Sequence, residues 1–135
     1  MPEGYISKAK STNWGTPPEI LKRFEGYFDP CPYPEPSFNG IGIPWPKWVF
    51  VNPPFSQLAK WAEKCAHEHQ HGTAHIVLLM PARTDTKAFH DYVLRYAEIE
   101  FIKGRLKFVD LDNSSIKPVS APFPCLLAHF GGIRK

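Results

Sequence analysis

The 135-residue sequence has no long apolar run, no glycine-rich phosphate-binding loop and few cysteines. A membrane-spanning helix needs about 20 apolar residues in succession, and no run approaches that length. The first residues lack the basic stretch followed by an apolar one that marks an export signal, so we expect a soluble, cytoplasmic protein. The three cysteines form no CxxC pair and leave one over, which favours reduced thiols over a disulfide framework.

Metal binding is also not expected. The one segment rich in possible ligands, His67 to His71, places its histidines at alternate positions. Alternate positions point apart on a helix, so the spacing fits the end of a surface helix better than a zinc site.

The composition is that of one globular domain. Hydrophobic residues make up 43% of the chain and aromatic residues 14%, which excludes a disordered protein. We expect a basic arm over residues 1–13 and a single domain over 14–135. The net charge of +3 suits a polyanionic partner, although many soluble domains share it. The oligomeric state stays open, a homodimer included.

A strand and a stiff turn organise the rest of the chain. The β-branched and aromatic run Trp48–Val51 favours a buried strand, which Pro53 and Pro54 stop because neither can donate to a ladder. Ser56 is placed to cap a helix that continues to His71, with Lys64 and Glu68 on its outer face. Residues 52–55 therefore follow the C-terminal end of a strand, where open α/β sheets bind ligands.

The chemistry that fits this turn is attack by an exocyclic amine of a nucleobase. The lone pair of such a nitrogen is drawn into the ring, so a catalyst must accept its protons while positive charge develops. The side-chain oxygen of Asn52 and a proline carbonyl are acceptors, held ready by the rigid turn. Phe55 offers a face on which a flipped base could stack. The alternative is an ordinary proline-rich loop after a strand.

Three further positions have both a structural and a ligand-binding interpretation. Thr16 is either a good N-cap for a helix with Pro17 at its first position or a residue that offers its hydroxyl to a ligand. Asp29 closes a short strand over residues 27–31, where it is either a turn residue or a contact for an amino group or a ribose hydroxyl. Arg83 leaves the strand 75–80 and is either an ion-pair partner or a contact for a phosphate or the base, while Thr84 or Asp85 caps the next helix.

The remaining pattern predicts the strand order and a basic strip. Strand 48–51, helix and strand 75–80 predict a parallel crossover, and strands follow at 99–102, 103–109 and 125–130, the last antiparallel as a hairpin partner. Lys103, Arg105 and Lys107 alternate on one face and form a basic strip. Prolines exclude a helix between Pro32 and Pro46.

Seven segments, taken in order, together resemble one known family. They are Trp14-x-Thr16-Pro17, Phe28-Asp29-Pro30, Phe50 to Ser56, Trp61-x-x-Lys64, Leu79 to Thr86, Phe101 to Phe108 and Ala121 to Pro124. The chain is similar, from Trp14 to about Phe130, to the phage-encoded DNA N-6-adenine methyltransferases of the Dam type.

The resemblance implies a minimal Rossmann-like α/β fold that uses S-adenosylmethionine, with a mostly parallel sheet and an antiparallel C-terminal strand. It implies site-specific methylation of the exocyclic amine of a flipped adenine in DNA, by a phage or prophage protein in a bacterial host. The residues implied are catalytic Asn52, Pro53, Pro54 and Phe55, cofactor-binding Trp14, Thr16, Pro17, Asp29, Pro30 and Asn52, and DNA-binding Arg83, Lys103, Arg105 and Lys107.

The chain also departs from that family. The segment between Asp29 and Asn52 is shorter than usual, and Asn39-Gly40 stands where the family carries Asp-Gly. Phe38, Ile41, Ile43 and Trp45 are then the candidates to cover the adenine of the cofactor. The second hypothesis is therefore a catalytically weak or inactive module that binds nucleic acid or cofactor.

Overall fold

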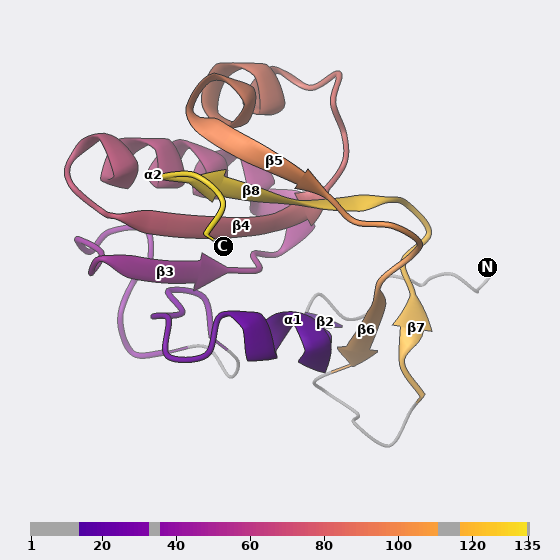
Figure 1. Ribbon diagram of the computed structural model, residues 1–135. Coiled ribbons are helices and arrows are strands. Elements are labelled where there is room, and N and C mark those ends of the chain that lie inside the picture. The colour runs from indigo at the N-terminus through magenta and orange to yellow at the C-terminus, as the bar shows by residue number, and fades with distance from the viewer. Residues whose placement is uncertain (1–13, 33–35, 111–116, 135) are drawn as a thin grey trace.

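The computed structural model describes residues 14–32, 36–110 and 117–134, and in Figure 1 these form a four-stranded sheet with helices on both faces and a smaller sheet at one end. The elements are β2 (Trp14–Gly15), α1 (Pro18–Arg23), β3 (Trp48–Val51), the 3-10 helix η2 (Phe55–Gln57), α2 (Leu58–Gln70), β4 (His75–Pro81), the π-helix η3 (Phe89–Leu94), β5 (Ala97–Phe101), β6 (Lys107–Asp110), β7 (Val119–Ser120) and β8 (Cys125–Phe130). No helix in the described ranges is long and apolar enough to cross a membrane.

The larger sheet has the strand order β3-β4-β8-β5. β3 and β4 are parallel, as the sequence predicts, whereas β8 is antiparallel to both of its neighbours, β4 and β5. The prediction of a mostly parallel sheet is therefore wrong, because β8 enters between two strands that run the same way. The antiparallel direction of β8 is confirmed, and its partners are β4 and β5.

Apolar runs explain which strands are central. All seven residues of β4 and all six of β8 are buried. A strand that has a neighbour on each edge and a packed layer on each face is expected to be mostly apolar, and these two segments are apolar except for His75 and His129. The predicted strands at 48–51 and 125–130 match β3 and β8 residue for residue.

Each face of this sheet packs against its own hydrophobic core. On one face, Trp61 and Cys65 of α2 and Phe89 and Val93 of η3 pack on alternate strand residues such as Ile76. The other face carries a core made by the intervening strand residues, α1, β6 and the segment before β8: Ile20, Phe24, Phe50, Val77, Leu79, Leu106, Phe108, Ala121, Cys125 and Leu127. The alternation of strand side chains thus supplies both layers.

All three predicted helix caps are wrong. Pro17 is the N-cap residue of α1 and makes no side-chain cap bond, so Thr16 lies one residue too early. Ser56 lies inside η2, and Gln57 precedes α2. The helical segment around η3 begins after Thr86, whose hydroxyl accepts the Phe89 N–H at 3.2 Å, in place of Thr84 or Asp85.

Two predicted strands are shorter than expected. The strand over residues 27–31 reduces to a single parallel bridge, in which Phe28 pairs with Val49 of β3. The strand over 103–109 begins only at Lys107, because Gly104 has a positive φ of 80° and turns the chain. β6 instead pairs with β2 on one side and β7 on the other, which makes the smaller sheet.

A chain of hydrogen bonds, buried at its centre and exposed at its Arg23 end, joins α1 and the segment after it to the larger sheet. Tyr27 Oη lies 2.8 Å from His75 Nδ1, His75 Nε2 lies 3.0 Å from His129 Nδ1, and His129 Nε2 lies 2.9 Å from Glu100 Oε1. Arg23 closes the chain with two bonds of 2.8 Å to the Glu100 carboxylate. With both imidazoles neutral, every bond has one donor: Tyr27 donates to His75, His75 to His129 and His129 to Glu100.

Candidate active site

The Asn52 turn lies where the C-terminal ends of two parallel strands meet. Val51 ends β3 opposite Leu78 of β4, and Asn52 follows directly. Pro53 is buried, whereas Asn52 and Phe55 are half-buried. Pro54 leads into η2, so the two prolines separate the strand from the helix with two fixed φ angles. The predicted position of the turn at the sheet edge is therefore confirmed.

The side chain of Asn52 is held from the other end of the chain. Its Nδ2 donates a hydrogen bond of 3.0 Å to the hydroxyl oxygen of Thr16, 36 residues earlier. Thr16 directly follows β2, whose Gly15 pairs with Val109 of β6. Sequence reasoning gave Thr16 a helix cap or a cofactor contact as its role, and it did not predict the bond to Asn52, because no local pattern reveals a partner so distant.

Phe55 belongs to an aromatic cluster. Its ring meets Phe108 edge-on at 6.1 Å between centroids and Phe123 edge-on at 5.5 Å. Arg83 completes the cluster, with its guanidinium 5.4 Å from the centre of the Phe123 ring. Edge-to-face contacts of this kind fix ring orientation. Phe55 is thus braced by its neighbours, and Phe123 is a site residue that the sequence analysis did not single out.

Asp29 follows the bridge between Phe28 and β3. Its Oδ1 accepts the N–H of Cys31 at 2.8 Å, which is the local turn expected of aspartate before proline. The side chain is nevertheless exposed. Loss of surrounding water raises the pKa of this carboxyl, and the Cys31 bond offsets part of that rise. A turn role and a ligand role are compatible here, because a carboxylate has acceptor sites to spare.

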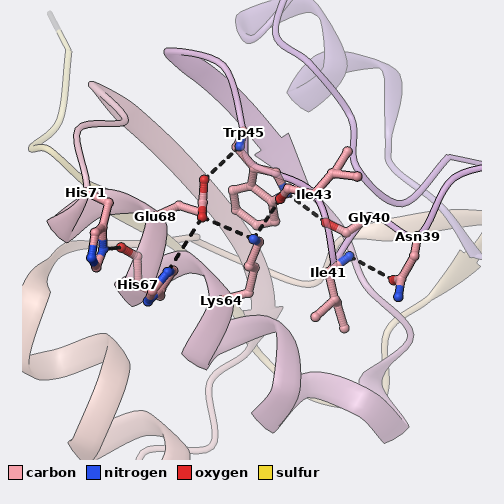
Figure 2. Close-up of polar contacts among 9 residues, drawn as sticks. All are labelled: Asn39, Gly40, Ile41, Ile43, Trp45, Lys64, His67, Glu68 and His71. Atoms are coloured by element: carbon pink, nitrogen blue, oxygen red, sulfur yellow. Dashed lines mark hydrogen bonds and ion pairs between the residues drawn. The ribbon is translucent and has the colours of Figure 1, made fainter.

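The loop between Asp29 and β3 is clamped onto α2, as Figure 2 shows. The Glu68 carboxylate accepts a hydrogen bond of 2.7 Å from the backbone N–H of Trp45 and forms an ion pair of 3.0 Å with Lys64. Lys64 also donates to the carbonyl of Ile43 at 2.7 Å. Desolvation alone would raise the pKa of the Glu68 carboxyl, but the Trp45 N–H and the Lys64 ammonium outweigh it and lower that pKa.

This clamp corrects the prediction that Lys64 and Glu68 face outward, since their side chains are only 11% and 10% exposed. It also changes the expected role of Trp45, which is buried against Trp61 and donates its indole N–H to Gly40 at 2.8 Å. Phe38 remains exposed and lies 6.0 Å from Phe28 between ring centres. Of the four residues predicted to cover an adenine ring, Trp45 is thus committed to the core.

Two predicted cofactor contacts have structural tasks. Pro17 is buried, and its carbonyl accepts the N–H groups of Ile20 and Leu21 at 3.0 and 3.1 Å. Pro30 is buried against Gly40. The backbone of Trp14 lies in β2, but its side chain is outside the described part of the structure, as are residues 1–13 with the predicted basic arm.

The four predicted DNA-binding cations are all exposed. Within the described residues, none of the four forms an ion pair. Lys103 and Arg105 lie in the turn after β5, and Lys107 starts β6, so the predicted strip is a turn and a strand end rather than one continuous strand. Phe101, which ends β5, pairs with Leu126 near the start of β8, so the turn leaves the sheet at the end where β4 reaches Pro81.

The histidine-rich segment does not gather ligands. The rings of His67 and His71 lie 4.2 Å apart between centres and are tilted by 31° to each other. Both residues line a groove between α2 and η3, to which residues 52–55 do not contribute. No group of three or more His, Cys, Asp or Glu that could hold a metal occurs in the described ranges.

Comparison with known proteins adds one finding. No curated protein and no solved structure matches the chain. The family model described as DNA N-6-adenine-methyltransferase (Dam) matches residues 36–130. The match includes the Asn52 turn, Arg83 and the three lysine and arginine positions after β5, whereas Trp14, Thr16, Pro17, Asp29 and Pro30 precede it. Because the match covers well over half of the sequence, the chain belongs to the DNA N-6-adenine-methyltransferase (Dam) family.

Proposed function

We propose that this protein transfers a methyl group from S-adenosylmethionine to the exocyclic amine of an adenine flipped out of DNA. The observation that carries the proposal is the half-buried Asn52 side chain, held by Thr16 at the end of β3 and inside the region that matches the family. Site specificity, phage origin and a cytoplasmic place of action are part of the same proposal through the family resemblance alone.

The turn would act on the amine through hydrogen-bond acceptors. The Asn52 side-chain oxygen and a proline carbonyl of the turn would accept the two amine protons, and these bonds would strengthen as positive charge develops on the nitrogen. Acceptors fixed before the reaction need no reorganisation during it, which is why the rigid Pro53 and Pro54 matter. Phe55, braced by Phe108 and Phe123, would stack on the flipped base.

The residues at the sheet edge are chemically suited to the cofactor. Asp29, an exposed residue, offers its carboxylate for an ammonium group or ribose hydroxyls, and Thr16 and Asn52 offer polar atoms where they meet after β2 and β3. When bound, S-adenosylmethionine supplies an electrophilic methyl group. The protein residues would hold the cofactor and orient the amine, while Arg83 and the cations after β5 would contact phosphates.

The second candidate is a weak or inactive binding module. One observation favours it: Trp45 is buried and bonded to Gly40, so it cannot also cover the adenine ring of a cofactor without leaving the core. Weak cofactor binding would follow. The two candidates share a fold and differ in turnover, which is what the experiment must measure.

The decisive experiment is single-turnover transfer of labelled methyl from the cofactor to duplex DNA, with RNA and a no-acid control. Wild type should label adenine N6 in DNA. Asn52→Ala should slow transfer by ~10²- to 10³-fold, because one preorganised acceptor is removed, while melting as the wild type does. Phe55→Ala should slow it through base stacking worth roughly 1–3 kcal/mol.

Cofactor binding is measured in parallel by calorimetry and thermal shift, since a bound ligand raises apparent stability. Binding without any transfer by the wild type would favour the second candidate. A folded Asn52→Ala protein with normal turnover would exclude the proposed mechanism.

A further inference from the structure

The four-residue turn is contacted at both ends by one small sheet, β2-β6-β7, which Figure 1 shows beside α1. At one end, Thr16 accepts the hydrogen bond from Asn52. At the other end, Phe108 of β6 contacts Phe55. Each contact residue is adjacent in sequence to a paired residue, because Gly15 precedes Thr16, Val109 follows Phe108, and Gly15 pairs with Val109.

These contacts close a ring through the backbone of the small sheet. The ring runs from Thr16 to Asn52, along the turn to Phe55, across to Phe108, and back through the β2–β6 pairing. β7 adds a second brace, since its Val119 pairs with Phe108 and Phe123, which follows β7, also contacts Phe55. A shift of the turn would therefore have to break contacts at both ends.

We propose that Thr16 is a positioning residue that acts on the reaction through Asn52, with the small sheet as its support. The inference rests on the proposed function. An asparagine amide presents an acceptor oxygen on one side and a donor NH₂ group on the other. With Nδ2 directed to Thr16, the oxygen lies on the opposite side of the amide. A rotated or displaced amide would bring N–H groups toward the attacking amine, where they repel its protons.

This assignment differs from a direct contact of Thr16 with the cofactor, and the two differ in what Thr16→Val does. Valine has nearly the shape of threonine without the hydroxyl. If Thr16 acts through Asn52, the variant loses rate, by roughly 10²-fold as for a misplaced catalytic group, and keeps the KM for the cofactor. If Thr16 mainly holds the cofactor, KM rises and the rate at saturation is kept.

A double-mutant cycle tests the route of action. Thr16→Val should slow transfer in the wild-type background and add nothing in the Asn52→Ala background, because the residue through which it acts is gone. Thr16→Ser retains the hydroxyl and should recover most of the rate that Thr16→Val removes. The matched control is Thr73→Val. Thr73 lies between α2 and β4, at the opposite end of β4 from the turn, so this change should alter neither the rate nor the KM.

A second measurement does not depend on activity. The side-chain amide signals of Asn52, assigned in ¹⁵N–¹H spectra by their loss in Asn52→Ala, should move in Thr16→Val and stay in place in Thr16→Ser. Asn52 amide signals that do not move in Thr16→Val would overturn the inference. So would a Thr16→Val change that slows transfer equally in the wild-type and Asn52→Ala backgrounds. A wild-type protein that moves no methyl group would overturn only the proposed function, because the spectra still decide whether Thr16 holds Asn52.

Discussion

Gly40 sets how closely the loop before β3 approaches the Asp29 segment. A Cβ at this position would lie 1.9 Å from the carbonyl oxygen of Pro30, a backbone atom that cannot swing away, and 3.0 Å from the ring of Trp61. We predict that Gly40→Ala lowers the free energy of unfolding by about 1–3 kcal/mol, as overpacking does, and weakens cofactor binding by displacing Asp29.

The matched control is Gly42→Ala, two residues along the same loop. A Cβ there would meet only the side chain of Asn39, at 3.1 Å, and that side chain can rotate. Chemical denaturation and calorimetry with the cofactor should separate the two variants. Equal stability of both would show that the loop moves freely on Pro30.

The clamp between the loop and α2 rests on one ion pair in a mostly buried position. We predict that Lys64→Met costs about 3 kcal/mol of stability, since it leaves the buried Glu68 carboxylate without its cation. Lys60→Met, on the exposed side of the same helix, should stay within about 0.5 kcal/mol of the wild type.

The stability difference between Lys64→Met and the wild type should depend on pH in a definite direction. The pKa of Glu68 is lowered in the folded protein, so its contribution is present above the ordinary value of 4.5 and is lost as pH falls through the folded pKa. The difference in denaturation midpoint between Lys64→Met and wild type should therefore shrink in acid. A difference that is constant with pH would mean that the charge of Glu68 is not what the clamp needs.

The Tyr27–His75–His129–Glu100–Arg23 chain joins segments from both halves of the protein. Burial, together with the charges of His129 and Arg134, lowers the pKa of His75 from 6.5 to about 4. Between those values the unfolded chain binds a proton that the folded protein excludes, so stability falls as pH falls, by about 1.4 kcal/mol per pH unit for each such proton. The pKa of His129 is lowered in the same direction, first by its own burial.

Unfolding free energies measured between pH 7 and 4.5 should show this slope in the wild type. His75→Gln removes the titrating group and should flatten this slope. His71 is exposed and lies outside the hydrogen-bond chain, so His71→Gln should leave the slope unchanged. Nuclear magnetic resonance titration of His75 in the wild type provides an independent check. An ordinary histidine titration there would contradict the prediction even if the variant did not fold.

DNA binding should depend on salt through the cations at the sheet edge. Each phosphate that the protein neutralises contributes about 0.9 to the slope of log affinity against log salt. Replacing Arg83, Lys103, Arg105 or Lys107 by glutamine should therefore reduce the slope by about that amount for each phosphate no longer neutralised. Lys87→Gln is the control, because Lys87 is exposed and already paired with Asp91 of η3. Unchanged slopes in all four variants would place the DNA elsewhere.

Local sequence pattern was enough for the strands β3, β4 and β8, the turn and the family. Apolar runs fix β3, β4 and β8 because burial selects residues one segment at a time, and Pro53 and Pro54 end β3 wherever the strand lies. Asn52, Phe55 and Arg83 could be placed at one edge because each follows a strand that runs in the same direction.

Only the tertiary structure decided the partners. The position of β8 between β4 and β5, the bond from Asn52 to Thr16, the burial of Lys64 and Glu68, and the packing of Phe123 on Phe55 all join residues or segments that a local pattern treats separately. Thr16 has the sequence of a helix cap, and Lys64 and Glu68 have the spacing of a surface pair. In the fold, Thr16 bonds to Asn52, and Lys64 and Glu68 bond to the loop before β3. Hydrogen bonds and burial depend on which distant segments the whole chain brings together.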